Sequence, residues 1–194
     1  MKHLKGLKEY LELNYQQAVL DQARSSGEAW VFHCHGERVI TSSAFANEPY
    51  ELIFEDGPQG RETLHKTEVK FFYQAEHEAA VRKFLKRDTK IRAQTLGPYY
   101  YTRDRFFVKN KSLYPLMMDR EVVFVTLLEG EMLRGIIAGF NRYEIGLHLK
   151  GGVPVTVLRH ALAAVQNKKG RSFLKRDQER LRDWQKSSYF VDQA

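Results

Sequence analysis

Short apolar runs separated by glycine-containing turns fill residues 121–168. The five runs are "EVVFVTLLEG", "EMLRGIIAGF", "YEIGLHLKGG", "VPVTVL" and "HALAAV". They are rich in Val, Ile, Leu and Phe, which is typical of antiparallel strands joined by tight turns. Strands this short bury their apolar faces only if the sheet bends into a small barrel, and Gly135, Gly139 and Gly146 are the predicted bends.

The first half of the chain carries a similar pattern, in "HGERVI", "PYELIF" and "TLHKTEV". Three dipeptides match between the halves in the same order. They are Gly36-Glu37 with Gly130-Glu131 and His65-Lys66 with Arg159-His160, both 94 residues apart, and Tyr50-Glu51 with Tyr143-Glu144, 93 residues apart. The matches predict a tandem duplication with one extra residue in a turn, and the interval indicates two copies of a small domain.

Three further segments have helical patterns. Leu4, Leu7 and Leu11 recur at helical spacing, so residues 3–24 are predicted to be one helix that packs over the first barrel. In the connector, "AEHEAAVRKFLKRD" has the composition of a helix, and "GPYYYTRDRFFVKNKSLYP" after it is predicted to be extended or loop. The tail from residue 167 is predicted to form a basic helix with Leu174, Leu181 and Trp184 on one stripe, docked by that stripe or serving a dedicated function.

The predicted fold is therefore mainly β, with two small, strongly bent five-stranded barrels, an N-terminal helix, and a helical connector and tail. The predicted divisions are residues 1–75 (helix and first repeat), 76–120 (connector), 121–168 (second repeat) and 169–194 (basic tail).

Positive charge is concentrated in the second half. Residues 1–97 hold 14 Lys and Arg against 14 Asp and Glu, whereas residues 98–194 hold 17 against 10. A basic half beside a neutral half favours an anionic partner, most commonly nucleic acid, although a basic surface that only aids solubility is the alternative.

Other functional classes find little support in the sequence. The apolar stretches are shorter than the roughly 18 residues of a membrane helix, and the N-terminus lacks the apolar core of a signal peptide, so a cytoplasmic protein is expected. Cys34 is the only cysteine; "HCH" at residues 33–35 has no further ligand at a suitable spacing, so neither a metal site nor a cofactor is expected. No nucleophile with a neighbouring base and no phosphate-binding glycine loop occurs, and the protein is not expected to be an enzyme.

Residues 121–168 resemble Hfq, the bacterial Sm-like RNA chaperone. The resemblance runs through "LLEGEMLRGIIAGFNRYEIGLHLK" and "VTVLRHALAAV", where Arg159 stands for the family's lysine and His160 and Ala161 match its Lys-His-Ala triplet. Residues 3–75 resemble the family's helix and barrel more loosely. The resemblance implies an Sm fold and a ring of six Sm units that binds single-stranded uridine-rich RNA around a central pore, in small-RNA-linked regulation of messages.

The resemblance also implies a set of site residues. Arg159 and His160 would sit at a tight turn, project from the barrel and bind phosphate and base, while Tyr143 would stack on a base. In the first repeat, Tyr50, His65 and Lys66 would form the corresponding site. The alternative is an Sm-like ring that serves as a protein-interaction scaffold with weak or no RNA binding.

Assembly follows from the edges of such barrels. Unpaired edge strands tend to pair with a neighbour, and rings form when the repeated rotation closes. Because one chain supplies two units, three chains would form a pseudo-hexameric ring. Six chains, with only the second repeats in the ring, are the alternative.

Overall fold

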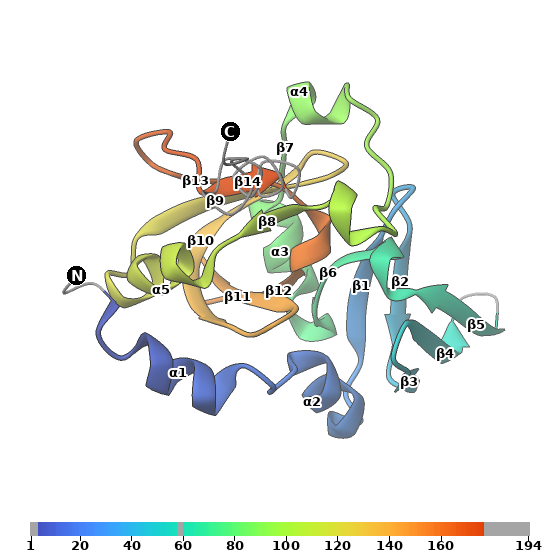
Figure 1. Cartoon of the computed structure of the whole chain (residues 1–194). Coiled ribbons are helices and arrows are strands. Elements are labelled where there is room, and N and C mark those ends of the chain that lie inside the picture. The colour runs from blue at the N-terminus through green and yellow to red at the C-terminus, as the bar shows by residue number, and fades with distance from the viewer. Residues whose placement is uncertain (1–3, 58–59, 177–194) are drawn as a thin grey trace, which may run out of the picture.

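The computed structural model describes residues 4–57 and 60–176, and strands are its most abundant secondary structure (Figure 1). The first repeat and the segment before it contain α1 (Leu7–Asn14), α2 (Val19–Ser26), β1 (Trp30–Cys34), β2 (Val39–Ser42), β3 (Phe45–Asn47), β4 (Glu51–Gly57), β5 (Gly60–His65), η2 (Lys66–Glu68) and β6 (Val69–Gln74). The connector contains η3 (Ala75–His77), α3 (Glu78–Phe84), β7 (Lys86–Arg87), α4 (Thr89–Arg92), η4 (Thr102–Asp104), β8 (Phe106–Val108) and α5 (Asn110–Met118). The second repeat contains β9 (Val122–Leu127), β10 (Glu131–Phe140), β11 (Glu144–Leu149), β12 (Pro154–Leu158), η5 (Arg159–Ala161) and β13 (Leu162–Asn167), and β14 (Leu174–Arg176) follows it.

The second repeat has the five predicted strands, in the sheet order β13-β9-β10-β11-β12. Two of the glycines predicted at bends, Gly135 and Gly139, have a structural role in β10. A Cβ on Gly135 would lie 2.5 Å from the backbone oxygen of His148, so only glycine fits there without a shift. The pairing of β10 with β11 slips between Ile137 and Gly139, which bends the strand as bulges do.

The first repeat keeps the same order but is divided between two sheets. Strands β6-β1-β2 belong to the large sheet and β3-β4-β5 form a separate three-stranded sheet. The division falls at Ser43, whose backbone N–H and hydroxyl both donate to the Asp56 carboxylate at 3.0 Å. The mainly β, antiparallel prediction is confirmed, but none of the sheets formed by the described strands closes into a barrel.

The strand pairings of the two repeats match at one constant residue offset. Trp30 pairs with Gln74 in the first repeat, and Val123 pairs with Asn167 in the second, so both members of the pair differ by 93 residues. The pairs Glu51 with His65 and Glu144 with Leu158 give the same difference of 93.

The constant offset corrects the alignment of the basic pairs. The sequence match at 94 residues was wrong by one position, because η2 begins at Lys66 and η5 at Arg159. Lys66 is therefore the counterpart of Arg159, and Thr67 is the counterpart of His160. His65 lies one residue before the turn, at the position of Leu158.

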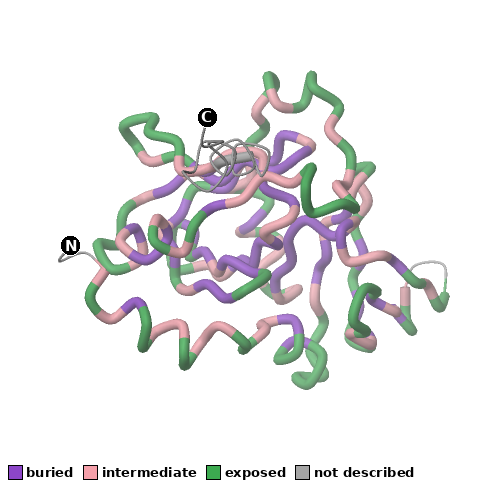
Figure 2. Tube along the Cα trace, in the orientation of Figure 1, coloured by how far each residue is buried: buried purple, intermediate pink, exposed green. Residues whose placement is uncertain are grey.

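The two repeats join edge to edge within the chain. Strand β12 of the second repeat pairs with β6 of the first, through Thr156 with Phe72 and Val157 with Phe71. The sheet therefore runs without interruption from one repeat into the other, and its central strands are the buried ones (Figure 2).

An ionic cluster reinforces the junction. The Lys70 side chain of β6 is 1% exposed and contacts both Glu129, in the β9–β10 turn, and Glu131, the first residue of β10. The backbone N–H of Gly36 in the first repeat also donates to Glu129, at 2.7 Å. Charges this deeply buried are tolerated only when paired, so these contacts fix the two repeats relative to each other.

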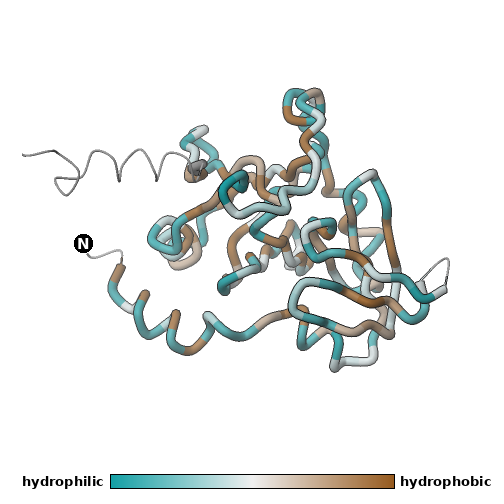
Figure 3. Tube along the Cα trace, turned by 45° about the vertical axis from the view of Figure 1, so that its right-hand side comes forward, coloured by the Kyte–Doolittle hydropathy of each residue, from teal (hydrophilic) through white to brown (hydrophobic). Residues whose placement is uncertain are grey.

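The helical predictions need three corrections. The single helix expected over residues 3–24 is two helices, α1 and α2, and apolar positions recur along α1 (Figure 3). The connector forms α3 as predicted, but α5 (Asn110–Met118) begins inside residues 97–115, which were expected to be extended or loop. In the tail, residues 167–176 form the end of β13, a turn, an extended segment and strand β14 rather than helix. The rest of the predicted tail helix lies outside the described residues.

Within the described ranges, no helix combines the length and the apolar character that crossing a membrane requires.

Candidate nucleic-acid interface

Each basic turn is held against a tyrosine by the same backbone hydrogen bond. The N–H of Arg159 donates to the Tyr143 carbonyl at 2.8 Å, and the N–H of Lys66 donates to the Tyr50 carbonyl at 2.8 Å. In both repeats the backbone therefore places a tyrosine next to the basic turn. The side chains of the two turns differ.

Arg159 is half-buried and its guanidinium is used inside the protein. One terminal nitrogen donates to the Asn141 carbonyl at 2.8 Å and to the Asn110 side chain at 3.0 Å, and the other donates to the Val108 carbonyl at 2.6 Å. Val108 and Asn110 belong to β8 and α5 of the connector. The connector thus lies over η5. The Arg159 side chain bonds to the connector instead of projecting freely from the turn.

His160 is also tied to the protein. Its Nε2 lies 2.8 Å from the carbonyl oxygen of Val69, the first residue of β6 in the other repeat. Burial lowers the pKa of His160 to about 4, and the nearby charge of Arg105 acts in the same direction, while the carbonyl hydrogen bond opposes it. The imidazole is therefore neutral at pH 7 and donates its N–H to the carbonyl, so it carries no charge for a phosphate.

A cleft of about 890 Å³ opens beside η5, between the second repeat, α1 and the connector. The predicted residues Tyr143, Arg159 and His160 all line it. Its remaining cations are Arg105, Lys109, Lys111 and Arg142, its other aromatic residues are Tyr15, Phe106 and Phe107, and none of the described residues in its wall is Asp or Glu.

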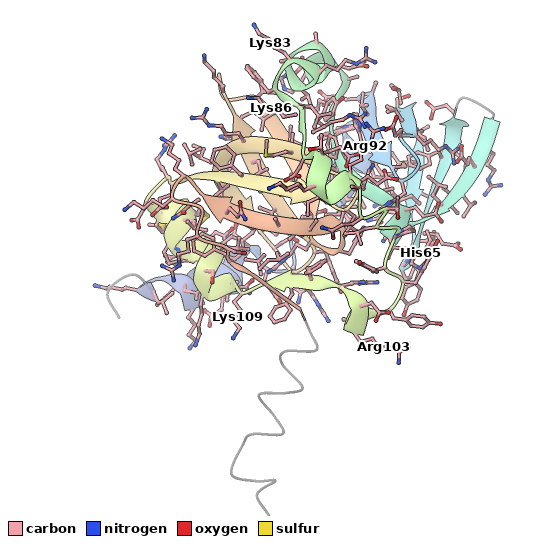
Figure 4. The ribbon with its side chains drawn as sticks, turned by 90° about the horizontal axis from the view of Figure 1, so that it is seen from above. His65, Lys83, Lys86, Arg92, Arg103 and Lys109 are labelled. Atoms are coloured by element: carbon pink, nitrogen blue, oxygen red, sulfur yellow. The ribbon has the colours of Figure 1, made fainter. Side chains whose placement is uncertain are left out.

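Three of the cations in the cleft are available to a ligand. Lys109, Lys111 and Arg142 are exposed, and none of them makes an ion pair within the described part of the chain. Arg105 is occupied, because it donates to the carbonyls of Tyr99 and Tyr100 at 2.9 and 2.8 Å. Lys109 lies on the side of the molecule that carries β8, whereas Lys83 and Lys86 lie on the opposite side (Figure 4).

Tyr143 presents an accessible ring at the cleft. The residue is 60% exposed, and the Arg142 guanidinium lies 5.2 Å from the centre of the ring. An exposed aromatic face beside free cations is the combination that single-stranded nucleic acids bind, since bases stack on the ring and phosphates contact the charges.

The predicted residues of the first repeat lie outside this cleft. Tyr50 is 74% exposed, and Lys66 is half-buried with its Nζ 3.4 Å from the Pro49 carbonyl. His65 bonds to Thr67 through Nδ1 at 2.6 Å and meets the Tyr100 ring edge to face at 5.3 Å. The connector therefore covers the first turn with Tyr100 and the second turn with β8.

Sequence reasoning missed Lys109, Lys111 and Arg142. The surplus of positive charge in the second half was the only signal for them. Lys109 and Lys111 belong to the connector, which has no counterpart in the duplicated pattern. Only the packing of β8 and α5 over η5 brings these lysines to the turn.

The "HCH" segment has ordinary contacts. His33 stacks on Phe71 with ring centres 4.2 Å apart, and its Nε2 lies 2.9 Å from the Tyr73 hydroxyl. His35 lies near Glu129, at 3.7 Å. Across residues 4–57 and 60–176, no group of three or more His, Cys, Asp or Glu side chains is arranged to hold a metal ion.

Comparison with known proteins gives no match: no protein-family model, no curated protein and no solved structure matches the chain.

Proposed function

We propose that each repeat is an Sm-like unit and that the protein binds single-stranded, uridine-rich RNA in the cleft beside η5. The observation that carries the proposal is the composition of that cleft, in which exposed cations and an exposed tyrosine meet and no described residue of the wall carries a carboxylate. The Hfq-like residues of the second repeat support it, and so does the shared strand order of the two repeats.

The residues of the proposed site have different roles. Lys109, Lys111 and Arg142 contact phosphates, because they are exposed and make no ion pair with any residue that the structure describes. Tyr143 stacks on an unstacked base. Arg159 is a positioning residue that holds β8 and α5 against the turn, and the neutral His160 stabilises the junction with the first repeat.

A duplex does not suit this site. Stacking on Tyr143 requires a base that is not already stacked and paired, whereas a single strand can offer one. The proposed role is accordingly that of an RNA chaperone of the Hfq type, acting on small RNAs and messages whose single-stranded segments it binds.

The test compares two lysine pairs on opposite sides of the molecule. Fluorescence anisotropy would measure the affinity for labelled oligo-U and oligo-A across a range of salt concentrations. Lys109→Ala with Lys111→Ala should weaken oligo-U binding and reduce the log–log salt slope by about 1.4, at roughly 0.7 for each lost phosphate contact. Lys83→Ala with Lys86→Ala removes the same charge from the far side and should leave both quantities near those of the wild type (Figure 4).

Two results would contradict the proposal. Equal losses in the two lysine variants would mean that binding depends on overall charge and not on the cleft. Wild-type affinity in both would remove the cleft from RNA binding and would favour the alternative of a protein-interaction scaffold.

A further inference from the structure

The joint between the repeats defines which edges of an Sm-like unit pair. The fourth strand of one repeat, β12, pairs with the last strand of the other, β6. Each repeat has a fourth strand and a last strand whose outer edge can pair. The joint uses one edge of each kind, so one of each kind remains in the chain. These are the outer edge of β5, the counterpart of β12, and the outer edge of β13, the counterpart of β6.

The offset of 93 residues identifies the matching positions. Phe72, which pairs with Thr156 at the joint, has Val165 as its counterpart in β13. Thr156 has Thr63 as its counterpart in β5. A second chain joined by the same geometry would therefore set Thr63 of one chain opposite Val165 of the next.

The chain itself already occupies that position of β13. After β13, a turn at Asn167–Gly170 reverses the backbone, and residues 171–173, here called the hairpin arm, return along the outer edge. The Phe173 N–H donates to the Val165 carbonyl at 2.9 Å, and the Asn167 N–H donates to the Arg171 carbonyl at 3.2 Å. Gln166 and Ser172 form an antiparallel bridge between these two bonds.

The turn and the arm have their own supports. The Asn167 side-chain oxygen accepts hydrogen bonds from the N–H groups of Lys169 and Arg171, each at 3.1 Å. Phe173 packs against the core of the second repeat, and the chain then pairs with β8 through β14. The hairpin arm is therefore held in place by hydrogen bonds in its turn and by the packing of Phe173.

The opposite edge is not covered. Strand β5 pairs with β4 alone among the described strands, and its residues 60, 61 and 63 are exposed. The outer edge of β5 is therefore open and the outer edge of β13 is covered. An open edge readily pairs with another strand.

We propose that the outer edge of β13 is a docking surface for β5 of a second copy of this chain, and that the hairpin arm competes with that copy for the edge. With the arm in place the chain is a monomer. With the arm released, chains join through β5 and β13, and three of them close the pseudo-hexameric ring. This inference rests on the pairing of the repeats and is independent of RNA binding.

The first measurement is the mass of the native chain by light scattering, expected near 22.7 kDa. Gln166→Cys with Ser172→Cys should lock the arm by a disulfide, since facing residues of an antiparallel bridge lie close enough for one. The locked chain should remain monomeric at every concentration. A mass of about 68 kDa for the locked chain would overturn the proposal, because three chains of 22.7 kDa would then join with the arm in place.

The second measurement releases the arm. Phe173→Pro removes the N–H that bonds to Val165 and should shift the mass from one chain to three. Lys169→Ala, an exposed change in the turn, is the control and should leave the mass unchanged. A Phe173→Pro chain that keeps its circular dichroism spectrum and remains monomeric would contradict the inference.

Cross-linking tests the register and does not depend on how well that variant folds. Glu62 and Gln166 lie one position beyond Thr63 and Val165 in the inferred pairing, so Glu62→Cys with Gln166→Cys should form a disulfide between chains. The cross-link should accumulate slowly in the otherwise native chain, as the arm opens, and at least tenfold faster with Phe173→Pro. Cys34 should not interfere, because burial raises the pKa of its thiol to about 12. Absence of the cross-link in the native background, with Gln166→Cys alone as its control, would overturn the inference.

Discussion

The two repeats share a backbone and differ in what their basic turns do. Both turns donate a backbone hydrogen bond to a tyrosine carbonyl, yet Arg159 bonds to three connector and loop groups while Lys66 has a single long contact. The difference arises from the connector, which places β8 and α5 over the second turn. The two repeats therefore share a strand order, and the connector between them gives one turn a separate role.

The same contrast applies to the outer strands. The last strand of the first repeat, β6, receives β12 from the other repeat, whereas the last strand of the second, β13, receives the hairpin arm. Both solutions satisfy the exposed backbone groups of an edge strand, which would otherwise invite pairing with other chains. The two edges differ in the source of the partner strand. The partner of β6 comes from the other repeat of the same chain, whereas in our proposal β5 of another chain replaces the hairpin arm on β13.

The largest expected difference between the repeats concerns stability. Arg159→Ala removes three hydrogen bonds from a half-buried guanidinium and leaves the Val108 and Asn141 carbonyls without it, so we expect a loss of about 3 kcal/mol in the free energy of unfolding. Lys66→Ala removes one contact of 3.4 Å and should cost roughly 0.5 kcal/mol or less. Urea denaturation followed by circular dichroism would measure both, and equal losses would contradict the separate role of Arg159.

The next difference concerns RNA binding by the two tyrosines. Tyr143→Ala should weaken oligo-U binding by about 1 to 3 kcal/mol, because it removes the exposed ring beside the free cations. Tyr50→Ala removes an even more exposed ring, but one outside the cleft, and should change the affinity less than about twofold. Anisotropy titrations at one fixed salt concentration would compare them. A larger effect from Tyr50 would move the proposed site to the first repeat.

A smaller effect is expected in the pH dependence of stability. His160 has a folded pKa of about 4 because of burial, and its counterpart Thr67 does not titrate. Between the unfolded pKa near 6.5 and a pH of about 4, the unfolded state binds a proton that the folded state does not. Stability is therefore lost as the pH falls through this range, by up to roughly 1.4 kcal/mol per pH unit for this group.

His160→Gln separates this contribution from those of other groups. The amide keeps a donor for the Val69 carbonyl and cannot be protonated in this range. The variant should lose less stability than the wild type between pH 7 and pH 5 in urea denaturation. An identical loss in the two proteins would show that His160 does not contribute, and His33, whose pKa burial also lowers to about 4, would be the next histidine to change.

The sequence predicted the second repeat best. Its five strands and the turn at Arg159-His160 follow from short apolar runs separated by glycines, and local patterns of this kind depend mainly on which face of a strand is buried. The first repeat was predicted less well. Its second strand is broken at Ser43 by contacts with Asp56, which lies in another strand, and spacing along the chain does not reveal such a contact.

The alignment of the repeats shows a different limit. Matching dipeptides suggested 94 residues for the basic pairs, and strand pairing gives 93, because letters can coincide one position out of register while backbone pairing cannot. A slip of one residue would turn every side chain to the other face of its strand. Pairing therefore decided that Thr67, and not Lys66, is the counterpart of His160.

What the sequence by itself determined is the set of local features: strand-forming runs, the pattern shared by the two halves, the basic turn beside Tyr143 and the surplus of positive charge in the second half. Only the tertiary structure decided which segments distant in the sequence lie together. It placed Lys109 and Lys111 at the turn, used Arg159 to hold the connector, and folded residues 171–173 onto β13. The physical reason is that strand formation depends on residues close in sequence, whereas edge pairing and clefts depend on which distant segments satisfy each other's hydrogen bonds and bury each other's apolar surface.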